Sequence, residues 1–170
     1  MNIFVHGGRR IAVLAALALS VLLACPARAE GVPPGSAAAG PSVPKILPAE
    51  PTSAATRAMI LSSARAGRRI VAVGKHGIVL LSDTDGGEFR QAKSVPVRST
   101  LTAVTFIDER TGWAVGQWGV VLRTDDGGES WTLQRSDLSV DQPLFSVYFR
   151  DKAHGFAVGL WSLVIETADG

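Results

Sequence analysis

The feature that most constrains this chain is an internal repeat that returns every 42 to 43 residues. A Val-Gly pair recurs at Val73, Val115 and Val158. An Asp-Gly pair keeps nearly the same step, at Asp85, Asp126 and Asp169. Because landmarks of different kinds share one register, we expect residues 57–170 to be copies of a single structural unit.

The complete middle copy predicts four short strands. They are expected at residues 101–106, 112–116, 120–124 and 130–134, separated by tight, glycine-rich turns. A period of about 42 residues with four antiparallel strands is typical of a β-propeller blade. The predicted fold class is therefore all-β: a partial β-propeller of four-stranded antiparallel blades.

The number of copies predicts an incomplete propeller. Residues 57–170 hold about 2.7 repeats, whereas a closed propeller has at least about four blades. The third copy stops inside a motif, so we expect a truncated chain with unpaired apolar strand edges. Such an open arc should be prone to association.

A motif in the middle copy identifies the kind of repeat. Residues 124–131 match the Asp-box, [Ser/Thr]-x-Asp-x-Gly-x-[Ser/Thr]-Trp, at the fixed positions Thr124, Asp126, Gly128, Ser130 and Trp131. A carboxylate at Asp126 can accept backbone N–H groups inside the turn, while Gly128 can take a positive φ and Trp131 can cover the turn. This chemistry is structural. The alternative, a catalytic or metal-binding Asp126, disagrees with a carboxylate that backbone N–H groups hold ionised.

The other two copies of the Asp-box depart from this pattern. The first, at residues 82–89, is interpreted as having an extra residue before its glycines, with Asp85 and Gly87 in the motif positions. It also lacks a hydroxyl residue before the aromatic one. The third copy begins at Thr167 and contains Asp169 as its motif carboxylate.

Three short segments carry a resemblance to a known family. Residues 68–74, 112–116 and 155–159, each followed by an Asp-box, resemble the photosystem II stability/assembly factor family and its secreted bacterial branch. The resemblance covers about two thirds of the chain, residues 57–170. It implies a seven-bladed propeller at full length, without catalytic residues or cofactors, that binds other proteins as an assembly or scaffolding factor. The implied partner is a protein of an envelope or membrane complex, and the family's role is in photosynthesis.

Sialidases also contain Asp-boxes and provide the enzymatic alternative. Their chemistry needs three arginines that converge on a substrate carboxylate and a Tyr nucleophile with a Glu partner. The one tyrosine here, Tyr148, alternates with apolar neighbours in a strand pattern, and no arginine lies in a recognisable catalytic motif. A sialidase-like hydrolase or carbohydrate-binding module therefore depends on fold analogy alone.

Candidate binding residues come from the turns between the second and third strands of each copy. These turns carry Lys75, His76, Trp118 and Trp161, and they should lie at the opposite end of the blades from the Asp-boxes. Exposed aromatic side chains are typical anchors for protein partners. The alternative is structural, because Trp118 and Trp161 can also wedge between adjacent blades.

Metal and nucleic-acid binding are not expected. His76 and His154 lie in different kinds of turn, predicted at opposite ends of the blades, so they should not share a metal ion. The formal charge is only +2, and basic residues alternate with acidic ones along the chain, which argues against a nucleic-acid groove.

The first 29 residues predict a secretory signal. Arg9 and Arg10 precede an apolar run at residues 11–24, and Ala27 and Ala29 suit a signal peptidase. The run is shorter than the roughly 20 residues that span a bilayer. Cleavage after Ala29 would release a cysteine-free chain of charge −1 without a membrane span, and we expect it in the periplasm. A lipid anchor at Cys25 is the alternative.

A linker should follow the signal. Residues 30–56 contain six of the nine prolines together with many Ala, Ser and Gly residues. Such a composition buries too little apolar surface to order a chain. We expect a disordered linker whose apolar pair, Ile46 and Leu47, could dock on the domain that follows.

Overall fold

The structure is a computed structural model, and it describes residues 45–170. The predicted signal at residues 1–29, the alternative anchor at Cys25 and the first part of the predicted linker lie outside the described residues. Those assignments stay predictions.

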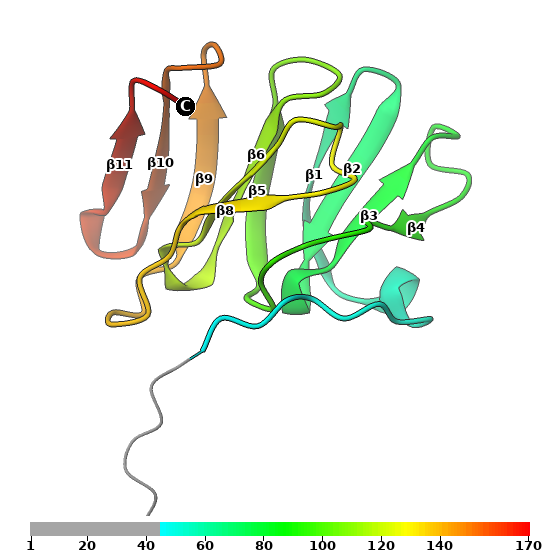
Figure 1. Ribbon diagram of the computed structural model, residues 1–170, viewed down its shortest axis with the longest axis horizontal. Helices are drawn as coiled ribbons and strands as arrows, with labels where there is room; N and C mark the ends of the chain where they lie inside the picture. The colour runs from blue at the N-terminus through cyan, green and yellow to red at the C-terminus, as the bar shows by residue number, and fades with distance from the viewer. Residues whose placement is uncertain (1–44) are drawn as a thin grey trace, which may run out of the picture. The chain divides into compact units, whose positions relative to one another are not determined.

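The described chain forms three antiparallel sheets, one after another along the sequence (Figure 1). The first blade contains β1 (Ile60–Ala66), β2 (Arg69–Gly74), β3 (Val79–Ser82) and β4 (Arg90–Gln91). The second contains β5 (Leu101–Phe106), β6 (Gly112–Gly116), β7 (Val121–Thr124) and β8 (Thr132–Arg135). The third contains β9 (Leu144–Phe149), β10 (Gly155–Gly159) and β11 (Val164–Thr167). This arrangement confirms the predicted all-β fold of partial propeller blades.

The hydrophobic core lies between the blades. Val71 and Leu81 of the first blade pack in one cluster with Leu101 and Leu122 of the second. A second cluster joins the second blade to the third through residues such as Leu144. A single blade cannot bury its own apolar faces, so each blade is stabilised by its neighbour.

Residues 45–56, which the sequence assigns to a disordered linker, lie against the first blade. Ile46 and Ala49 pack on the cluster between the first two blades, and the Ala49 N–H donates to the Val95 carbonyl at 2.9 Å. The short 3₁₀ turn η1 (Ala55–Arg57) buries Ala55 against the first sheet. Burial of these apolar side chains offsets the entropy cost of ordering a Pro-rich segment.

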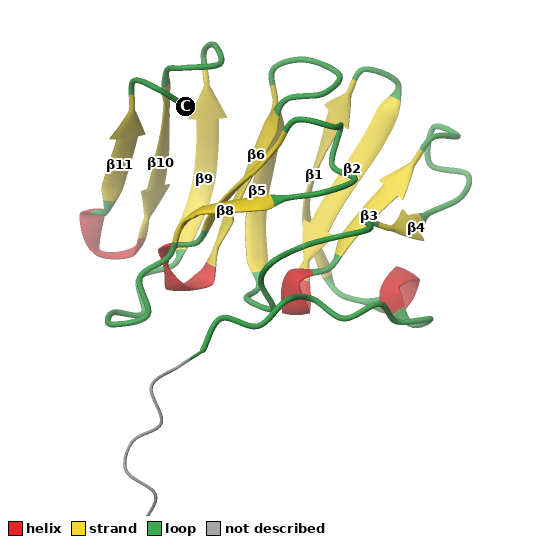
Figure 2. Cartoon of the chain, in the orientation of Figure 1, coloured by secondary structure: helices red, strands yellow, loops and turns green. Residues whose placement is uncertain are grey.

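The turns divide into two groups at opposite ends of the sheets. Three 3₁₀ turns, η2 (Lys75–Gly77), η3 (Gln117–Gly119) and η4 (Leu160–Ser162), join the second and third strands of each blade (Figure 2). We call their common end the η-turn end. We call the opposite end the Asp-box end. There each Asp-box turn lies beside the turn that joins the first two strands of a blade. In the second blade, for example, the Gly127 N–H donates to the Arg110 carbonyl at 2.8 Å.

Candidate functional site

The middle Asp-box is a hydrogen-bonded turn. Thr124 Oγ1 donates to Asp126 Oδ1 at 2.8 Å and accepts the Gly128 N–H at 3.0 Å. The Asp126 carboxylate also accepts the backbone N–H and the hydroxyl of Ser130. Trp131 is 4% exposed and donates its indole N–H to the Gly128 carbonyl. The motif residues therefore hold the turn and fill the core between the first two blades.

The protonation of Asp126 agrees with this role. Partial burial raises the pKa of its carboxyl, but hydrogen bonds from Ser130 and Thr124 outweigh that effect, and the net pKa is lowered. A general acid at neutral pH needs a raised pKa. Asp126 is therefore an ionised acceptor in the turn.

The first Asp-box repeats two of these backbone hydrogen bonds with different residues. The Gly86 N–H donates to Ser82 Oγ at 2.9 Å, and the Glu88 N–H donates to Thr84 Oγ1 at 2.9 Å. Thr84 thus occupies the place of Asp126, and Gly86, not Gly87, occupies the place of Gly128. The extra residue expected from the sequence is absent.

Asp85 has a different contact. Its carboxylate lies on the surface and pairs with Arg65 at 2.6 Å, outside the turn. An ungapped comparison starting from Ser82 would have placed Thr84 correctly. The hydroxyl of Thr84 was overlooked because the motif specifies a carboxylate at that position.

The third Asp-box begins as the second one does. Thr167 Oγ1 donates to Asp169 Oδ1 at 2.8 Å and accepts the Gly170 N–H at 3.1 Å. Asp169 is exposed, and the described chain ends at the next residue.

At the η-turn end, one histidine and two tryptophans share one unusual backbone conformation. His76, Trp118 and Trp161 have φ values of 59°, 60° and 54°. Positive φ is uncommon for residues other than glycine, and strained positions of this kind cluster at functional sites. The repeat therefore displays a side chain at the same point of each blade.

The two tryptophans at this end differ in burial. Trp161 is 67% exposed, whereas Trp118 is half-buried and packs on the cluster between the first and second blades. Lys75 and His76 are exposed. Trp118 thus packs between adjacent blades, as the structural alternative expects. Trp161 is exposed, as a binding anchor should be.

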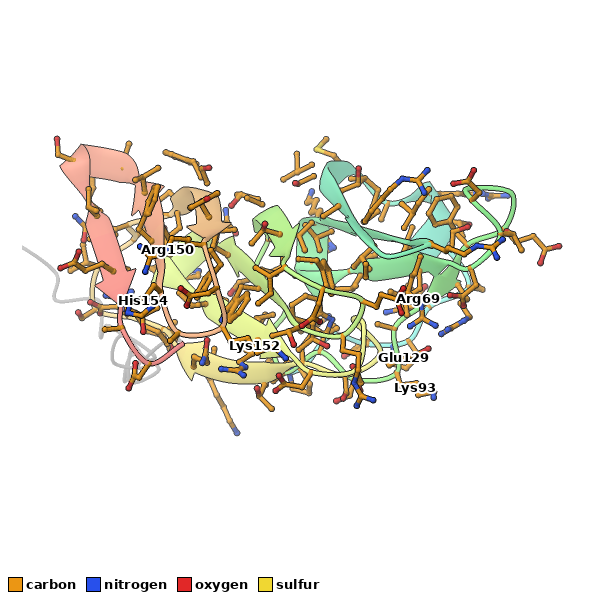
Figure 3. All side chains as sticks on the ribbon, turned by 90° about the horizontal axis from the view of Figure 1, so that it is seen from above. Arg69, Lys93, Glu129, Arg150, Lys152 and His154 are labelled. Atoms are coloured by element: carbon orange, nitrogen blue, oxygen red, sulfur yellow. The ribbon has the colours of Figure 1, made fainter. Side chains whose placement is uncertain are left out.

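Charged residues at the Asp-box end are mostly paired. Figure 3 looks onto this end and shows Arg69, Glu129 and Lys93 together. Arg69 contacts Asp83 at 2.5 Å, and Arg90 pairs with both Asp83 and Glu129. The hydrogen bond from Arg90 lowers the pKa of Glu129. The hydrogen bond from Arg69 lowers the pKa of Asp83. These pairs link the first blade to the Asp-box turn of the second.

A second charged group lies on the other side of the same view, where Arg150, Lys152 and His154 are labelled (Figure 3). Lys152 Nζ lies 3.2 Å from Asp108 Oδ2 of the preceding blade. The backbone N–H groups of Thr111 and Arg110 lower the pKa of Asp108 to about 2. His154 Nδ1 lies 3.0 Å from Asp151, far in the fold from His76 at the η-turn end.

Tyr148, the residue that the sialidase alternative would use, is 53% exposed on β9. Its ring lies 5.5 Å from that of Phe156, and both line a hollow of about 300 Å³ that Glu166 also reaches. Within residues 45–170 no hydrogen bond joins Tyr148 to Glu166. The nucleophile pair of a sialidase is therefore not assembled in the part of the chain described.

Within residues 45–170, no group of three His, Cys, Asp or Glu side chains is placed to hold a metal ion. The same residues contain no helix that is long and apolar enough to cross a membrane.

Comparison with known proteins gives a match at the level of fold. No protein-family model and no curated protein matches the chain. A structure of YCF48 bound to D1 peptide matches with a TM-score of 0.58 and 21% identity, over 66% of this chain and 38% of that one. YCF48 from Cyanidioschyzon merolae matches with a TM-score of 0.56 and 17% identity, over the same shares. Both are β-propellers, and this chain spans 38% of their length.

Proposed function

We propose that the chain is a non-enzymatic protein-binding propeller module that contacts its partner through the η-turn end. The likeness in fold to YCF48, solved in one case with a D1 peptide, supports a protein ligand. The sequence resemblance to photosystem II stability/assembly factors supports the same class of function. In this proposal the module is an assembly or scaffolding factor for an envelope or membrane protein complex.

The single observation that carries the choice of surface is the exposure of Trp161. Its ring is 67% exposed, although its backbone is held at a φ of 54° by a turn repeated in all three blades. An exposed aromatic side chain on a rigid turn loses little entropy on binding and is a common hot spot. His76 and Lys75 extend the same end with polar and cationic groups.

The carboxylates of the Asp-box end support a binding role over an enzymatic one. Asp83, Asp126 and Glu129 have lowered pKa values because each accepts hydrogen bonds from neighbouring side chains. None of the three has the raised pKa that a catalytic acid requires. Their charges are engaged in holding turns and blades together.

The predicted signal at residues 1–29 supports a location in the periplasm. There the mature chain would meet the outward domains of membrane complexes. The family resemblance supports a photosynthetic complex as the partner.

Alanine substitution tests the surface. Trp161→Ala should abolish recovery of the partner from native envelope extracts while leaving the circular dichroism melt unchanged, because the ring has few contacts to lose. Tyr148→Ala, which removes another exposed aromatic ring outside the η-turn end, is the matched control and should retain the partner. Equal recovery with Trp161→Ala and wild type would refute the proposed surface.

A further inference from the structure

Residues 45–52, here called the strap, lie against the first two blades without joining any of their sheets. In Figure 1 the strap is the cyan segment along the edge of the blades where Figure 2 draws the 3₁₀ turns in red. Among the described residues, its one backbone–backbone hydrogen bond to the blades is the one that the Ala49 N–H donates to Val95. Its other contacts come from side chains, so the strap is held as a separate peptide would be.

Gln91, in β4, recognises the backbone of the strap. Its Nε2 donates to the Glu50 carbonyl at 3.0 Å, and its Oε1 accepts the Thr52 N–H at 3.0 Å. A carbonyl and an N–H two residues apart are the groups that one residue of a parallel neighbouring strand would engage. The side-chain amide thus binds an extended backbone whatever side chains that backbone carries.

Side-chain selection comes from two positions of the strap. Ile46 and Ala49 pack on the apolar cluster between the first two blades, whereas Leu47 and Pro48 are exposed. A Cβ at Gly77 would lie 3.3 Å from the Cβ of Ala49, so η2 passes close to this position. An aliphatic residue and, three residues later, a small one therefore fit these contacts.

The next position of the strap carries a charge. Glu50 Oε1 lies 3.3 Å from Arg98 Nη1, with the two side chains 70% and 46% exposed. An exposed ion pair contributes little stability and acts mainly on specificity. Segments with few buried contacts and exposed hydrogen bonds open most readily. We therefore expect the strap to open while the sheets stay paired.

We propose that the surface under the strap binds an extended segment of a partner protein with the pattern aliphatic-x-x-small-acidic, in exchange with the strap. We call this surface, formed by Gln91, Arg98, Gly77 and the apolar cluster, the strap site. The strap has the same pattern and occupies the site in the free chain. Because the strap is tethered, its effective concentration is high, and the partner segment binds by releasing it. The strap site does not rest on the proposed function of Trp161.

A peptide titration of the full chain tests the proposal. The probe is a fluorescein-labelled peptide with the sequence of residues 45–53. The wild-type chain should bind it weakly, because its own strap competes. A chain with Ile46→Asp and Ala49→Asp, which releases the strap without changing the blades, should bind the probe at least about tenfold more tightly.

Variants of the peptide and of the strap site measure the pattern. Ala49→Asp in the peptide should weaken binding to the strap-released chain at least about tenfold, because it brings a charge to the apolar cluster. Leu47→Ala in the peptide is the matched control and should bind as the native sequence does. Glu50→Lys in the peptide should weaken binding several-fold, and Arg98→Glu in the chain should restore it.

Amide hydrogen exchange in the wild-type chain tests displacement without a variant of the chain. Excess Leu47→Ala peptide, whose fragments differ in mass from those of the chain, should speed exchange in residues 45–52. Exchange in β2 and β3 should not change, because the sheets do not depend on the strap.

Three results would overturn the proposal: no binding to a strap-released chain with an unchanged circular dichroism melt, equal binding of the native and Ala49→Asp peptides, or unchanged exchange in residues 45–52. A wild-type dimer that the peptide dissociates would also overturn it, since the strap of a second copy would then hold the site. Recovery of a partner through Trp161 is measured separately, so its failure is distinguishable from these results.

Discussion

The ring of Trp113 in β6 lies flat on the ring of Phe149 in β9, with centroids 3.5 Å apart and planes 6° apart. This stack joins the second blade to the third. Phe149 also faces Gly155 across its own sheet, and a Cβ at Gly155 would lie 2.5 Å from the ring. The glycine thus leaves the space in which the aromatic ring can lie between blades.

The same pairing of an aromatic residue with glycine occurs in the second blade and is missing from the first. Phe106 stands opposite Gly112, but in the first blade the equivalent residues are Arg65 and Ile70. Both members change together. In the first blade these two positions lie on the outward face, which packs on η1 and carries the Arg65–Asp85 ion pair.

Loss of the Phe149 ring should destabilise the protein strongly. Phe149→Ala removes a side chain that is 8% exposed and should lower the free energy of unfolding by about 3–5 kcal/mol. Tyr148→Ala, on the open side of the same strand, should change it by less than about 1 kcal/mol. Urea denaturation measures both values, and similar losses from the two variants would contradict the inter-blade role of Phe149.

A methyl group at Gly155 should also destabilise the fold. Gly155→Ala should cost about 1–3 kcal/mol because the new Cβ displaces the Phe149 ring. Gly87→Ala is the control, since its Cβ comes no closer than 3.3 Å to Thr84. Combining Gly155→Ala with Phe149→Leu should cost less than the sum of the two single changes in thermal or urea unfolding. Strict additivity would show that the two sites are independent.

Much of this fold can be predicted from sequence because the repeat marks it three times. Val-Gly and Asp-Gly pairs locate strand ends and turns, and the spacing within residues 124–131 dictates the hydrogen bonds of one turn. The sequence also contains the two Phe–Gly pairs, because Phe106 precedes Gly112 by six residues and Phe149 precedes Gly155 by the same number. Their meaning required the neighbouring sheet, which only the structure supplies.

Other features depend on contacts that no local pattern contains. Trp118 and Trp161 have the same turn, yet only Trp118 packs on a cluster shared with the preceding blade. The order of residues 45–56 depends on long-range burial of Ile46 and Ala55. Thr84 was missed because a hydroxyl can replace a carboxylate as acceptor of the same backbone N–H group.

Removal of the carboxylate should lower stability more at Asp126 than at Asp85. Asp126→Asn should lower stability by about 1–2 kcal/mol at neutral pH, because it removes a charged acceptor from the turn. Asp85→Asn should change it by less than about 0.5 kcal/mol, since Asp85 forms only an exposed ion pair. Thermal unfolding of the two variants measures the difference, and equal losses would contradict the assignment of Thr84 to the first turn.

The effect of Asp126 should depend on pH in one direction. Its pKa is lowered in the folded state, so its stabilisation is present above the unfolded value of about 3.9 and is lost as pH falls through the folded value. The difference between wild type and Asp126→Asn should therefore shrink in acid. A difference that grows below pH 4 would contradict the lowered pKa.

The two tryptophans of the η-turn end should respond differently to substitution. Trp118→Ala should lower the free energy of unfolding by about 1–3 kcal/mol, because a half-buried ring leaves the inter-blade cluster. Trp161→Ala should change it by less than about 0.5 kcal/mol. Equal destabilisation by both changes would place Trp161 in the core.

Site-specific photocrosslinking in the native envelope measures directly which end of the blades contacts a protein partner. A benzophenone side chain at position 161 or 76 samples the η-turn end, and one at position 154 or 85 samples the Asp-box end. We expect the same protein to be crosslinked from positions 161 and 76 and not from the other two. Crosslinks from positions 154 and 85 alone, or from none of the four, would contradict a protein-binding η-turn end.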